Sequence, residues 1–259
     1  MLLAIDIGNT NIQFGLYPRG SSELCCSWRA QTVHQRMGDE YAVLLRNFFT
    51  EQDLSFADVS AVVLASVVPP LTPRFVEMSE RYLKQTPLVV TPSVKSGVRV
   101  LLDNPDELGA DRLVNAAAVK ALYGTPAIVI DFGTATTFDV VNRDGDYVGG
   151  AITVGIGLAQ EALVSHAARL VKVDIEPPPS AIGRSTVQAM QSGLFLGYTA
   201  LIEGMVQRLA AELGEPNVHV IATGGRASHF AQHTPVIQAT APSLTLDGLR
   251  IIWEMNQPG

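Results

Sequence analysis

The chain has 259 residues, 47% of them hydrophobic and 17% charged, and a formal net charge of −7 at pH 7. This length suits one large domain or two domains of roughly 100–150 residues, each able to bury its own core. The acidic balance argues against nucleic acid as a main partner, because a surface that binds a phosphate backbone is basic. It leaves room for a small anion in a local site.

The longest apolar stretches of the sequence, such as residues 61–68, are far shorter than the ~20 residues needed to cross a membrane. The N-terminal residues run directly into Asp6 without a charged region, which indicates a strand and not a signal peptide. The two cysteines, Cys25 and Cys26, are adjacent and show no metal-binding spacing. We therefore expect a reduced, cytoplasmic protein without a membrane segment.

Apolar runs, helical spacing and turn residues divide the first half of the chain into distinct elements. In chain order they predict strands at residues 2–6, 11–17 and 23–30, a helix at 38–52, a strand at 61–67, a helix at 72–84, a strand at 88–91 and a helix at 111–122. The last of these helices would join two halves of the chain, and we place the domain boundary near residue 119.

The second half of the chain repeats this order. It predicts strands at residues 127–131, 134–141 and 146–153, helices at 156–169 and 184–213, a strand at 218–222 and helices at 225–233 and 245–256. Gly193 and Gly197 predict a bend or break in the longest helix. The repeated order predicts two related α/β domains, residues 1–119 and 120–259.

One phrase occurs in both halves: an apolar run followed by aspartate, glycine and residues with hydroxyl groups. It reads DIGNT at residues 6–10 and DFGTATT at residues 131–137. A carboxylate at the end of a buried strand must be paired or exposed at a cleft, because burying an unpaired charge is costly. Successive turn amides can form an anion-binding concavity. Each copy alone also suits an ordinary hairpin turn, but two copies favour a phosphate site with two walls.

A third phrase, Thr223-Gly224-Gly225, follows an apolar strand and opens a helix. Paired glycines at such a turn let a flat ligand lie against the backbone, although they also suit a tight connection with no ligand. The three phrases, in this order, resemble the phosphate-1, phosphate-2 and adenosine motifs of the actin-like ATPase superfamily. The resemblance implies an α/β fold of two ribonuclease-H-like domains, each a mixed five-stranded sheet flanked by helices, with a cleft between them.

A fourth stretch, NPDELGADR at residues 104–112, forms a loop that opens a helix. Helix N-terminal amides attract anions, and the helix dipole alone would favour Asp111 in the first turn. Arg112 is less favoured there, so we expect its guanidinium to bind a carboxylate. That carboxylate is either on a substrate or on Asp106 or Glu107.

This stretch is similar to the signature of type III pantothenate kinases. Five phrases of that family stand here in order, at residues 6–10, 104–112, 131–137, 182–193 and 223–225. The resemblance implies that the protein uses ATP to phosphorylate the primary hydroxyl of pantothenate, which is the first step of coenzyme A synthesis. No P-loop GxxxxGK[ST] sequence is present, which agrees with this family.

The resemblance also implies roles for individual residues. Asp111 would be the general base and Gly109, Ala110, Asp111, Arg112 and Thr186 would bind pantothenate. ATP would be bound by Asp6, Ile7, Gly8, Asn9, Thr10, Asn11, Ile12, Gln13, Thr134, Gly224 and Gly225, with Asp6 near Mg²⁺. Asp131 would hold a monovalent cation, K⁺ or NH₄⁺. The family forms homodimers in which the partner subunit completes the pantothenate pocket.

The sequence departs from the family at one position. Leu102 stands where many relatives carry a tyrosine that touches pantothenate, so a hydroxyl contact would be missing. Two other interpretations remain open, a sugar or short-acid kinase and a nucleotide-binding regulatory protein of the same fold without turnover. Asp111 favours catalysis, because a regulator has no need of a base there. The five histidines show no ligand-like cluster.

Overall fold

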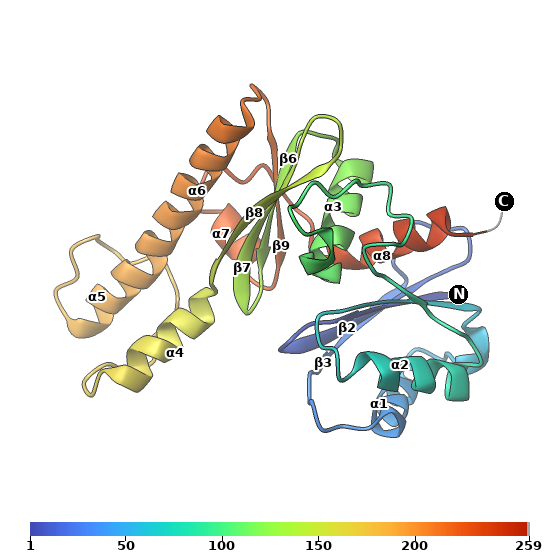
Figure 1. The fold of residues 1–259 in the computed structure, drawn as a ribbon. Coiled ribbons are helices and arrows are strands. Elements are labelled where there is room, and N and C mark those ends of the chain that lie inside the picture. The colour runs from blue at the N-terminus through green and yellow to red at the C-terminus, as the bar shows by residue number, and fades with distance from the viewer. Residues whose placement is uncertain (258–259) are drawn as a thin grey trace. The chain divides into compact units, whose positions relative to one another are not determined.

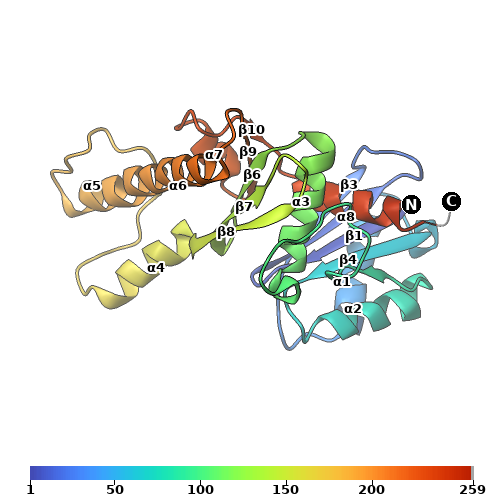
Figure 2. The same ribbon diagram turned by 45° about the horizontal axis from the view of Figure 1, so that its top comes forward.

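A computed structural model describes residues 1–257 and divides the chain into two compact units. Unit 1 consists of residues 1–123 together with the C-terminal residues from 243 onward, and unit 2 consists of residues 124–242. Each unit has a five-stranded mixed sheet (Figures 1 and 2). Among residues 1–257, no helix has the length and apolar character needed to span a membrane.

The sheet of unit 1 has the strand order β3-β2-β1-β4-β5. Its strands are β1 (Leu2–Ile7), β2 (Asn11–Tyr17), β3 (Cys26–Gln31), β4 (Ala61–Ser66) and β5 (Leu88–Val89). β1 pairs antiparallel with β2 and parallel with β4. This central position explains the continuous apolar run in β1, because a strand covered on both faces needs hydrophobic side chains on both.

Helices cover both faces of this sheet (Figure 1). They are α1 (Gly38–Thr50), α2 (Thr72–Met78) with its π-helical continuation η2 (Ser79–Leu83), α3 (Ala110–Leu122) and α8 (Leu244–Met255), besides the short 3₁₀ helices η1 (Phe56–Asp58) and η3 (Pro105–Glu107). Apolar side chains of α1 and α2 form one core with β1 and β2. α3 and α8 lie on the opposite face (Figure 1).

The C-terminal helix α8 packs within unit 1, which corrects the expected second domain of residues 120–259. Its backbone at Gly248 lies directly against Val114 of α3, so that an added Cβ would stand 2.3 Å from the Val114 carbonyl oxygen. A buried hydrogen bond from Thr245 Oγ1 to Asn115 Oδ1 (2.9 Å) joins the same two helices. An amphipathic pattern reveals an apolar face but not its partner, and here the partners of α8 are α3 and β1.

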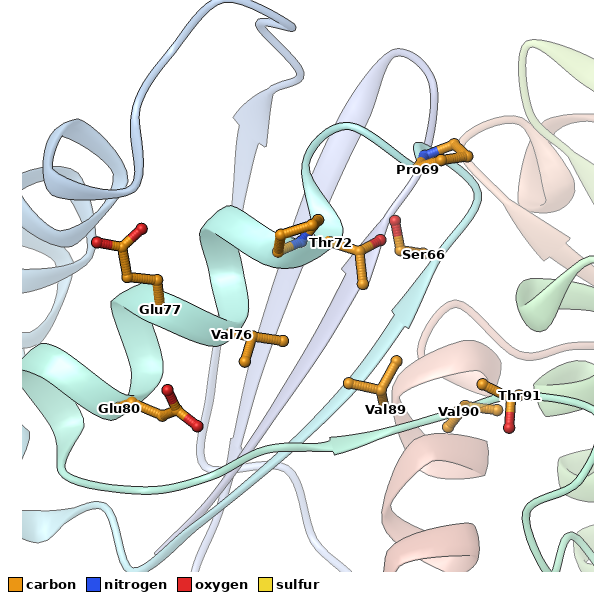
Figure 3. A pocket seen from close by; sticks show the side chains of 10 residues that line it. Ser66, Pro69, Thr72, Val76, Glu77, Glu80, Val89, Val90 and Thr91 are labelled. Atoms are coloured by element: carbon orange, nitrogen blue, oxygen red, sulfur yellow. The ribbon is translucent and has the colours of Figure 1, made fainter.

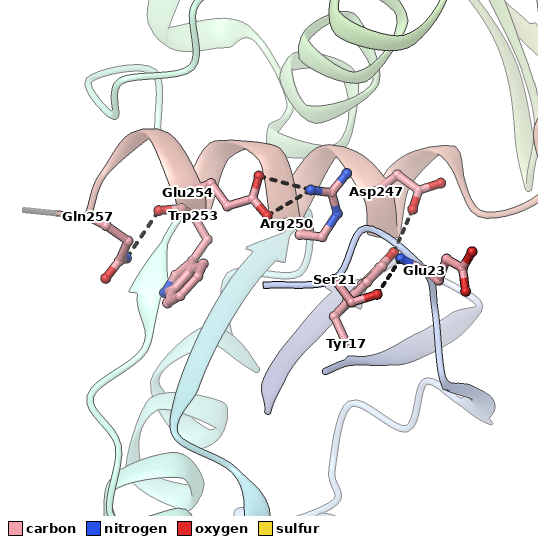
Figure 4. Close-up of polar contacts among 8 residues, drawn as sticks. All are labelled: Tyr17, Ser21, Glu23, Asp247, Arg250, Trp253, Glu254 and Gln257. Carbon is pink, nitrogen blue, oxygen red and sulfur yellow. Dashed lines mark hydrogen bonds and ion pairs between the residues drawn. The ribbon is translucent and has the colours of Figure 1, made fainter. Parts of the chain in front are cut away.

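Polar contacts also attach α8 to the sheet of unit 1 (Figure 4). The hydroxyl of Tyr17, on β2, donates to Asp247 Oδ1 at 2.8 Å. Along α8, Arg250 donates to both carboxylate oxygens of Glu254, at 2.7 and 2.9 Å. Burial, together with the carboxylate of Asp247, raises the pKa of Tyr17 well above its ordinary value. The hydroxyl therefore stays protonated and remains a donor.

The sheet of unit 2 has the strand order β10-β9-β6-β7-β8. Its strands are β6 (Ala127–Phe132), β7 (Ala135–Val141), β8 (Tyr147–Val154), β9 (His219–Gly224) and β10 (Ala239–Thr240). Taken from β6 outward, this is the same topology as in unit 1. The predicted fold class of two related mixed sheets flanked by helices is thereby confirmed. The two-residue strand β10 is too short for a periodic pattern, and sequence reasoning missed it.

The helices of unit 2 are α4 (Ile156–His166), α5 (Thr186–Gln191), α6 (Gly197–Leu213) and α7 (Ala227–Ala231). A π-helical turn, η4 (Ser192–Leu196), lies between α5 and α6 and includes Gly193. The long predicted helix at 184–213 is therefore one helical stretch from residue 186 to 213, in which the hydrogen-bond pattern changes to π-helical at residues 192–196. Apolar residues of α4, α6 and α7 form one core with β6 and β7.

Candidate active site

The first aspartate phrase forms the end of β1 and the loop to β2. We call residues 8–10 the β1–β2 loop. The amide of Gly8 donates to the carbonyl of Asn11 at 3.0 Å, which closes a tight hairpin turn. Asn9 and Thr10 are exposed at its tip. The loop thus presents the polar side chains of Asn9 and Thr10 to solvent.

The other predicted ATP-binding residues of this phrase differ in their exposure. Ile7 and Ile12 have no exposed surface and belong to the core, so their side chains serve packing. Asp6 and Gln13 are partly buried and face each other across β1 and β2. Asn11, at the start of β2, is exposed.

Thr32, which sequence reasoning missed, contacts the β1–β2 loop twice. It follows β3 directly, and its amide donates to the carbonyl of Thr10 at 2.9 Å. Its Oγ1 donates to the carbonyl of Gly8 at 2.6 Å. No local pattern marks this threonine, because its importance comes from pairing with residues more than 20 positions earlier.

The GADR phrase forms the start of α3. Gly109 is the N-cap residue, and a Cβ placed there would stand 2.6 Å from Asp111 Oδ1. The carboxylate of Asp111 therefore occupies the space that a side chain at position 109 would need. The same oxygen accepts a hydrogen bond from the amide of Arg112 at 2.8 Å. Arg112 and Ala110 are partly buried beside it.

Val67 connects this turn with the end of β1 inside unit 1. Its amide donates to the carbonyl of Ile7 at 3.0 Å. Its Cγ1 atom lies 3.6 Å from the position of an added Cβ at Gly109. The structure thus brings the GADR turn and the β1–β2 loop to the same end of the unit 1 sheet, as the carboxyl ends of parallel strands β1 and β4 require.

Burial raises the pKa of Asp111 above its ordinary value of 3.8. The amide and the positive charge of Arg112 act in the opposite direction but do not cancel this effect. A raised carboxyl pKa is typical of groups that accept or donate protons in catalysis. The surroundings of Asp111 therefore disfavour its charged form.

Leu102 is partly buried in the segment before η3. Two residues later, the side chain of Asn104 donates to Glu107 Oε1 at 3.0 Å across η3. A hydrogen bond between two of its own side chains therefore stabilises the loop that leads to the GADR turn.

In unit 2, the second aspartate phrase and the Thr-Gly-Gly phrase lie side by side. Asp131 of β6 is opposite Thr137 of β7 and Thr223 of β9. Gly224 has a φ of +87°, and an added Cβ would stand 2.6 Å from Asp131 Oδ1. Gly225 donates its amide to the carbonyl of Phe132 at 3.2 Å. The structure therefore brings Asp131, Gly224 and Gly225 together.

Thr134 is exposed in the short loop between β6 and β7. The amide of Gly155, the residue after β8, donates to the carbonyl of Thr134 at 3.1 Å. A Cβ at Gly155 would stand 2.3 Å from that oxygen, so no other residue fits there without a shift. Sequence reasoning did not single out Gly155.

Thr186 is the first residue of α5 in unit 2 and is exposed. The preceding Ser185 caps this helix, since its Oγ accepts the amide of Gln188 at 3.2 Å. Gly183 lies so close to the helix that an added Cβ would stand 2.3 Å from the amide nitrogen of Ala189. The phrase at residues 182–193 therefore specifies how α5 begins.

A cavity of about 650 Å³ lies in unit 1 and contains none of the predicted site residues (Figure 3). Val76, Val89 and Val90 give it apolar walls, and Glu77 and Glu80 line it from α2 and η2. Its lining also includes Ser66, the residue before Val67. Within residues 1–257, no three His, Cys, Asp or Glu side chains gather as a metal-binding group.

Comparison with known proteins identifies relatives along nearly the whole chain. Residues 2–208 match the model of the family described as type III pantothenate kinase. The type III pantothenate kinase of Dehalococcoides mccartyi strain CBDB1 is 46% identical over 256 residues, which cover 99% of this chain and 96% of the relative. That of Moorella thermoacetica is 47% identical over 256 residues, which cover 99% of this chain and 100% of the relative.

Solved structures share the fold at low sequence identity. A conserved Campylobacter jejuni protein of the Baf family of transcriptional activators has a TM-score of 0.63 at 18% identity and covers 98% of both chains. The inorganic polyphosphate/ATP-glucomannokinase of Arthrobacter sp. strain KM has a TM-score of 0.53 at 14% identity and covers 99% of both chains. These likenesses support the actin-like kinase fold. The family match and the identity to full-length relatives show that the chain belongs to the type III pantothenate kinase family.

Proposed function

We propose roles for individual residues in the reaction of this enzyme. As a type III pantothenate kinase, it phosphorylates pantothenate with ATP in coenzyme A biosynthesis. The observation that carries the residue assignment is the position of the Asp111 carboxylate over Gly109, connected through Val67 to the end of β1. A proton acceptor and a phosphate loop thereby share one end of a sheet.

Asp111 is the general base. The primary hydroxyl of pantothenate attacks the γ-phosphorus of ATP, a bond to that phosphorus forms, and the bond to the β–γ bridging oxygen breaks. The hydroxyl proton passes to the Asp111 carboxylate and ADP leaves. In a loose transition state this transfer comes late, so the base acts mainly by its position. The raised pKa of Asp111 supports this role.

Pantothenate carries a carboxylate, and the start of α3 suits it. Amides at a helix N-terminus and the guanidinium of Arg112 both favour an anion there. Gly109 leaves room for the Asp111 carboxylate, and the small side chain of Ala110 lets the substrate approach the backbone. Leu102 contributes an apolar contact where family members use a tyrosine, and Thr186 adds a hydroxyl.

ATP is bound by the two aspartate phrases and the Thr-Gly-Gly turn. The exposed residues 9–11 hold phosphate oxygens with their amides and side chains, and Thr134 adds a hydroxyl. Gly224 lets this turn pack against Asp131, and Gly225 offers bare backbone to adenosine. The carboxylate of Asp6 suits a hard divalent cation such as Mg²⁺, which when bound neutralises phosphate charge.

Asp131 holds a monovalent cation, K⁺ or NH₄⁺. Asp131 Oδ1 and the Phe132 carbonyl oxygen stand 2.6 and 2.7 Å from the position of an added Cβ at Gly224, which supports this role, because carboxylate and backbone carbonyl oxygens are suitable ligands. We expect replacement of K⁺ by a large organic cation to abolish activity. Full activity without K⁺ or NH₄⁺ would refute this cation site.

We also propose a homodimer in the cytoplasm. Ile152 and Val154, on the edge strand β8, are 63% and 50% exposed, and such apolar edges are usually covered. Light scattering after size exclusion measures the mass directly. A fully active monomer would contradict the dimer.

One assay tests the residue assignment and separates it from a regulatory protein without turnover. Purified protein is incubated with MgATP, KCl and pantothenate, while ADP and phosphopantothenate are measured by mass. We expect Asp111→Asn to lower kcat by roughly 10²–10⁴ while ATP binding survives, the range for losing a general base. Unchanged turnover in this variant would remove Asp111 from its role.

A further inference from the structure

We propose that Thr32 is a positioning residue that sets the direction of the phosphate-binding amides in the β1–β2 loop. The inference rests on the proposed role of this loop in ATP binding. Thr32 itself lies outside every phrase that the family resemblance assigns to the site. It is 8% exposed, so it acts on the nucleotide only through the loop.

Two hydrogen bonds from one residue fix two carbonyl groups of the loop. Thr32 Oγ1 donates to the carbonyl of Gly8, and the Thr32 amide donates to the carbonyl of Thr10. Both carbonyls therefore point toward the end of β3. The anchor itself is firm, because β3 pairs with β2 along its whole length.

Because the peptide bond is planar, holding the two carbonyl groups also fixes the direction of the amides that follow them. In a trans peptide, the carbonyl of one residue and the amide of the next point in opposite directions. With the Gly8 and Thr10 carbonyls held toward Thr32, the amides of Asn9 and Asn11 point away from it. Both residues are exposed, and on our proposal a phosphate approaches from the side to which their amides point.

Unit 2 provides an internal comparison. Gly155 follows β8 as Thr32 follows β3, and its amide donates to the carbonyl of Thr134. The backbone bond is therefore present in both units. The hydroxyl bond has no counterpart at Gly155, which lacks a side chain. The hydrogen bond from Thr32 Oγ1 to the carbonyl of Gly8 is therefore a feature of the loop in unit 1 that Gly155 does not provide in unit 2.

Thr32→Val tests this addition, because it removes the hydroxyl but keeps the branched shape and the amide. We expect the dissociation constant for MgADP, measured by calorimetry, and the KM for ATP to rise about tenfold, as for the loss of one hydrogen bond of ~1.4 kcal/mol. The KM for pantothenate should stay within about twofold. Amide hydrogen exchange at residues 9–11 should accelerate in the nucleotide-free protein. Thr32→Ser keeps the donor. It should restore the dissociation constant for MgADP, the KM for ATP and the amide exchange rate to their wild-type values.

Thr199→Val is the matched control. Thr199 is also 8% exposed, and its Oγ1 donates to the carbonyl of Phe195 at 2.9 Å within a helix. It should lose comparable stability without a change in nucleotide affinity. Equal nucleotide affinity in Thr32→Val and wild type, or an equal loss in both valine variants, would overturn the proposal. If Thr32→Val does not fold, Thr32→Cys replaces it as the variant without a hydroxyl. A nucleotide affinity of Thr32→Cys equal to that of Thr32→Ser would contradict the role of the hydroxyl group.

Addition of MgADP to the labelled protein separates this proposal from the loop assignment on which it rests, because NMR reports on the amides themselves. If the amide signals of residues 9–11 do not shift, the β1–β2 loop is not the phosphate site and both ideas fail. If these signals shift and Thr32→Val does not weaken binding, only the positioning role of Thr32 is lost.

Discussion

Gly224 lies against the carboxylate of Asp131 with no room for a side chain, since an added Cβ would stand 2.6 Å from Oδ1. The same Cβ would meet the amide nitrogen and carbonyl oxygen of Phe132 at 2.7 Å. The φ of +87° adds a second reason for glycine, because residues with a Cβ rarely adopt it. The Thr-Gly-Gly turn therefore fixes the distance between β9 and the second aspartate.

We expect Gly224→Ala to raise the concentrations of ATP and of K⁺ that are needed for half-maximal activity, both together. The new methyl group must displace Asp131 or the backbone of β6, and either shift alters both proposed sites. The midpoint concentrations of ATP and KCl in the kinase assay measure this effect. Gly214→Ala is the control, since Gly214 has a φ of +69° but open space around it. It should lose only about 1–2 kcal/mol of stability. Identical kinetics in both variants would show that Asp131 does not depend on this contact.

Gly109→Ala should lower kcat by displacing the carboxylate of Asp111, the proposed base. Its methyl group would take the place of Asp111 Oδ1, which is a side-chain atom that can swing away. The fold should therefore survive while kcat falls, and the KM for ATP should change little. In the background of Asp111→Asn, Gly109→Ala should cause no further loss, because the same group is already removed. An additive loss in the double variant would show that position 109 acts on something other than Asp111.

Asp111→Asn should stabilise the protein at neutral pH while it inactivates the enzyme. The pKa of Asp111 is raised in the folded state above its ordinary 3.8, so the folded protein favours the protonated carboxyl. The stabilisation of the folded state by protonated Asp111 is complete below pH 3.8. It is lost as the pH rises through the pKa of Asp111 in the folded state. Asparagine removes the cost of the buried charge and still accepts the Arg112 amide.

Melting temperatures across the pH range measure this effect. The variant should melt higher than wild type at pH 7–8, and the difference should shrink as the pH falls toward 4. In the wild-type enzyme, kcat should fall on the same acid side as Asp111 becomes protonated. A variant less stable than wild type at neutral pH would contradict the raised pKa.

Gly248→Ala should destabilise unit 1, although alanine is the better helix former. The Cβ would stand 2.3 Å from the Val114 carbonyl oxygen, so α3 and α8 would have to separate. Overpacking of this kind costs about 1–3 kcal/mol. Gly197→Ala, in α6 with nothing within 4 Å of the added Cβ, should instead gain about 0.5–1 kcal/mol. Urea denaturation measures both, and a stable Gly248→Ala protein would contradict the packing of α8 on α3.

The sequence predicted the strands and their repeated order well, because buried central strands carry unmistakable apolar runs. It also marked the GADR turn and both aspartates, whose residue types suit their chemistry. The partner of α8 was not predictable from its own pattern, since an apolar face fits any complementary surface.

Thr32 and Gly155 show a different limit of sequence reasoning. Both act on a loop from the end of another strand, and neither belongs to a local motif. Their roles follow from register, which is decided when the strands pair. The close contact of Gly109 with Asp111 was predictable only in part. The GADR phrase marks both residues, but the three-dimensional structure is needed to see that the Asp111 carboxylate fits only when position 109 has no side chain.

The return of α8 to unit 1 also sets the order in which the protein can be completed during synthesis. Unit 2 is one continuous segment, and its synthesis is complete before residue 243 is added. Unit 1 must wait for the last helix, and until then the apolar face of α3 is uncovered. The synthesis of unit 2 is therefore complete before that of unit 1, and the proposed phosphate loop and the proposed base lie in a unit that is complete only after α8 has been made.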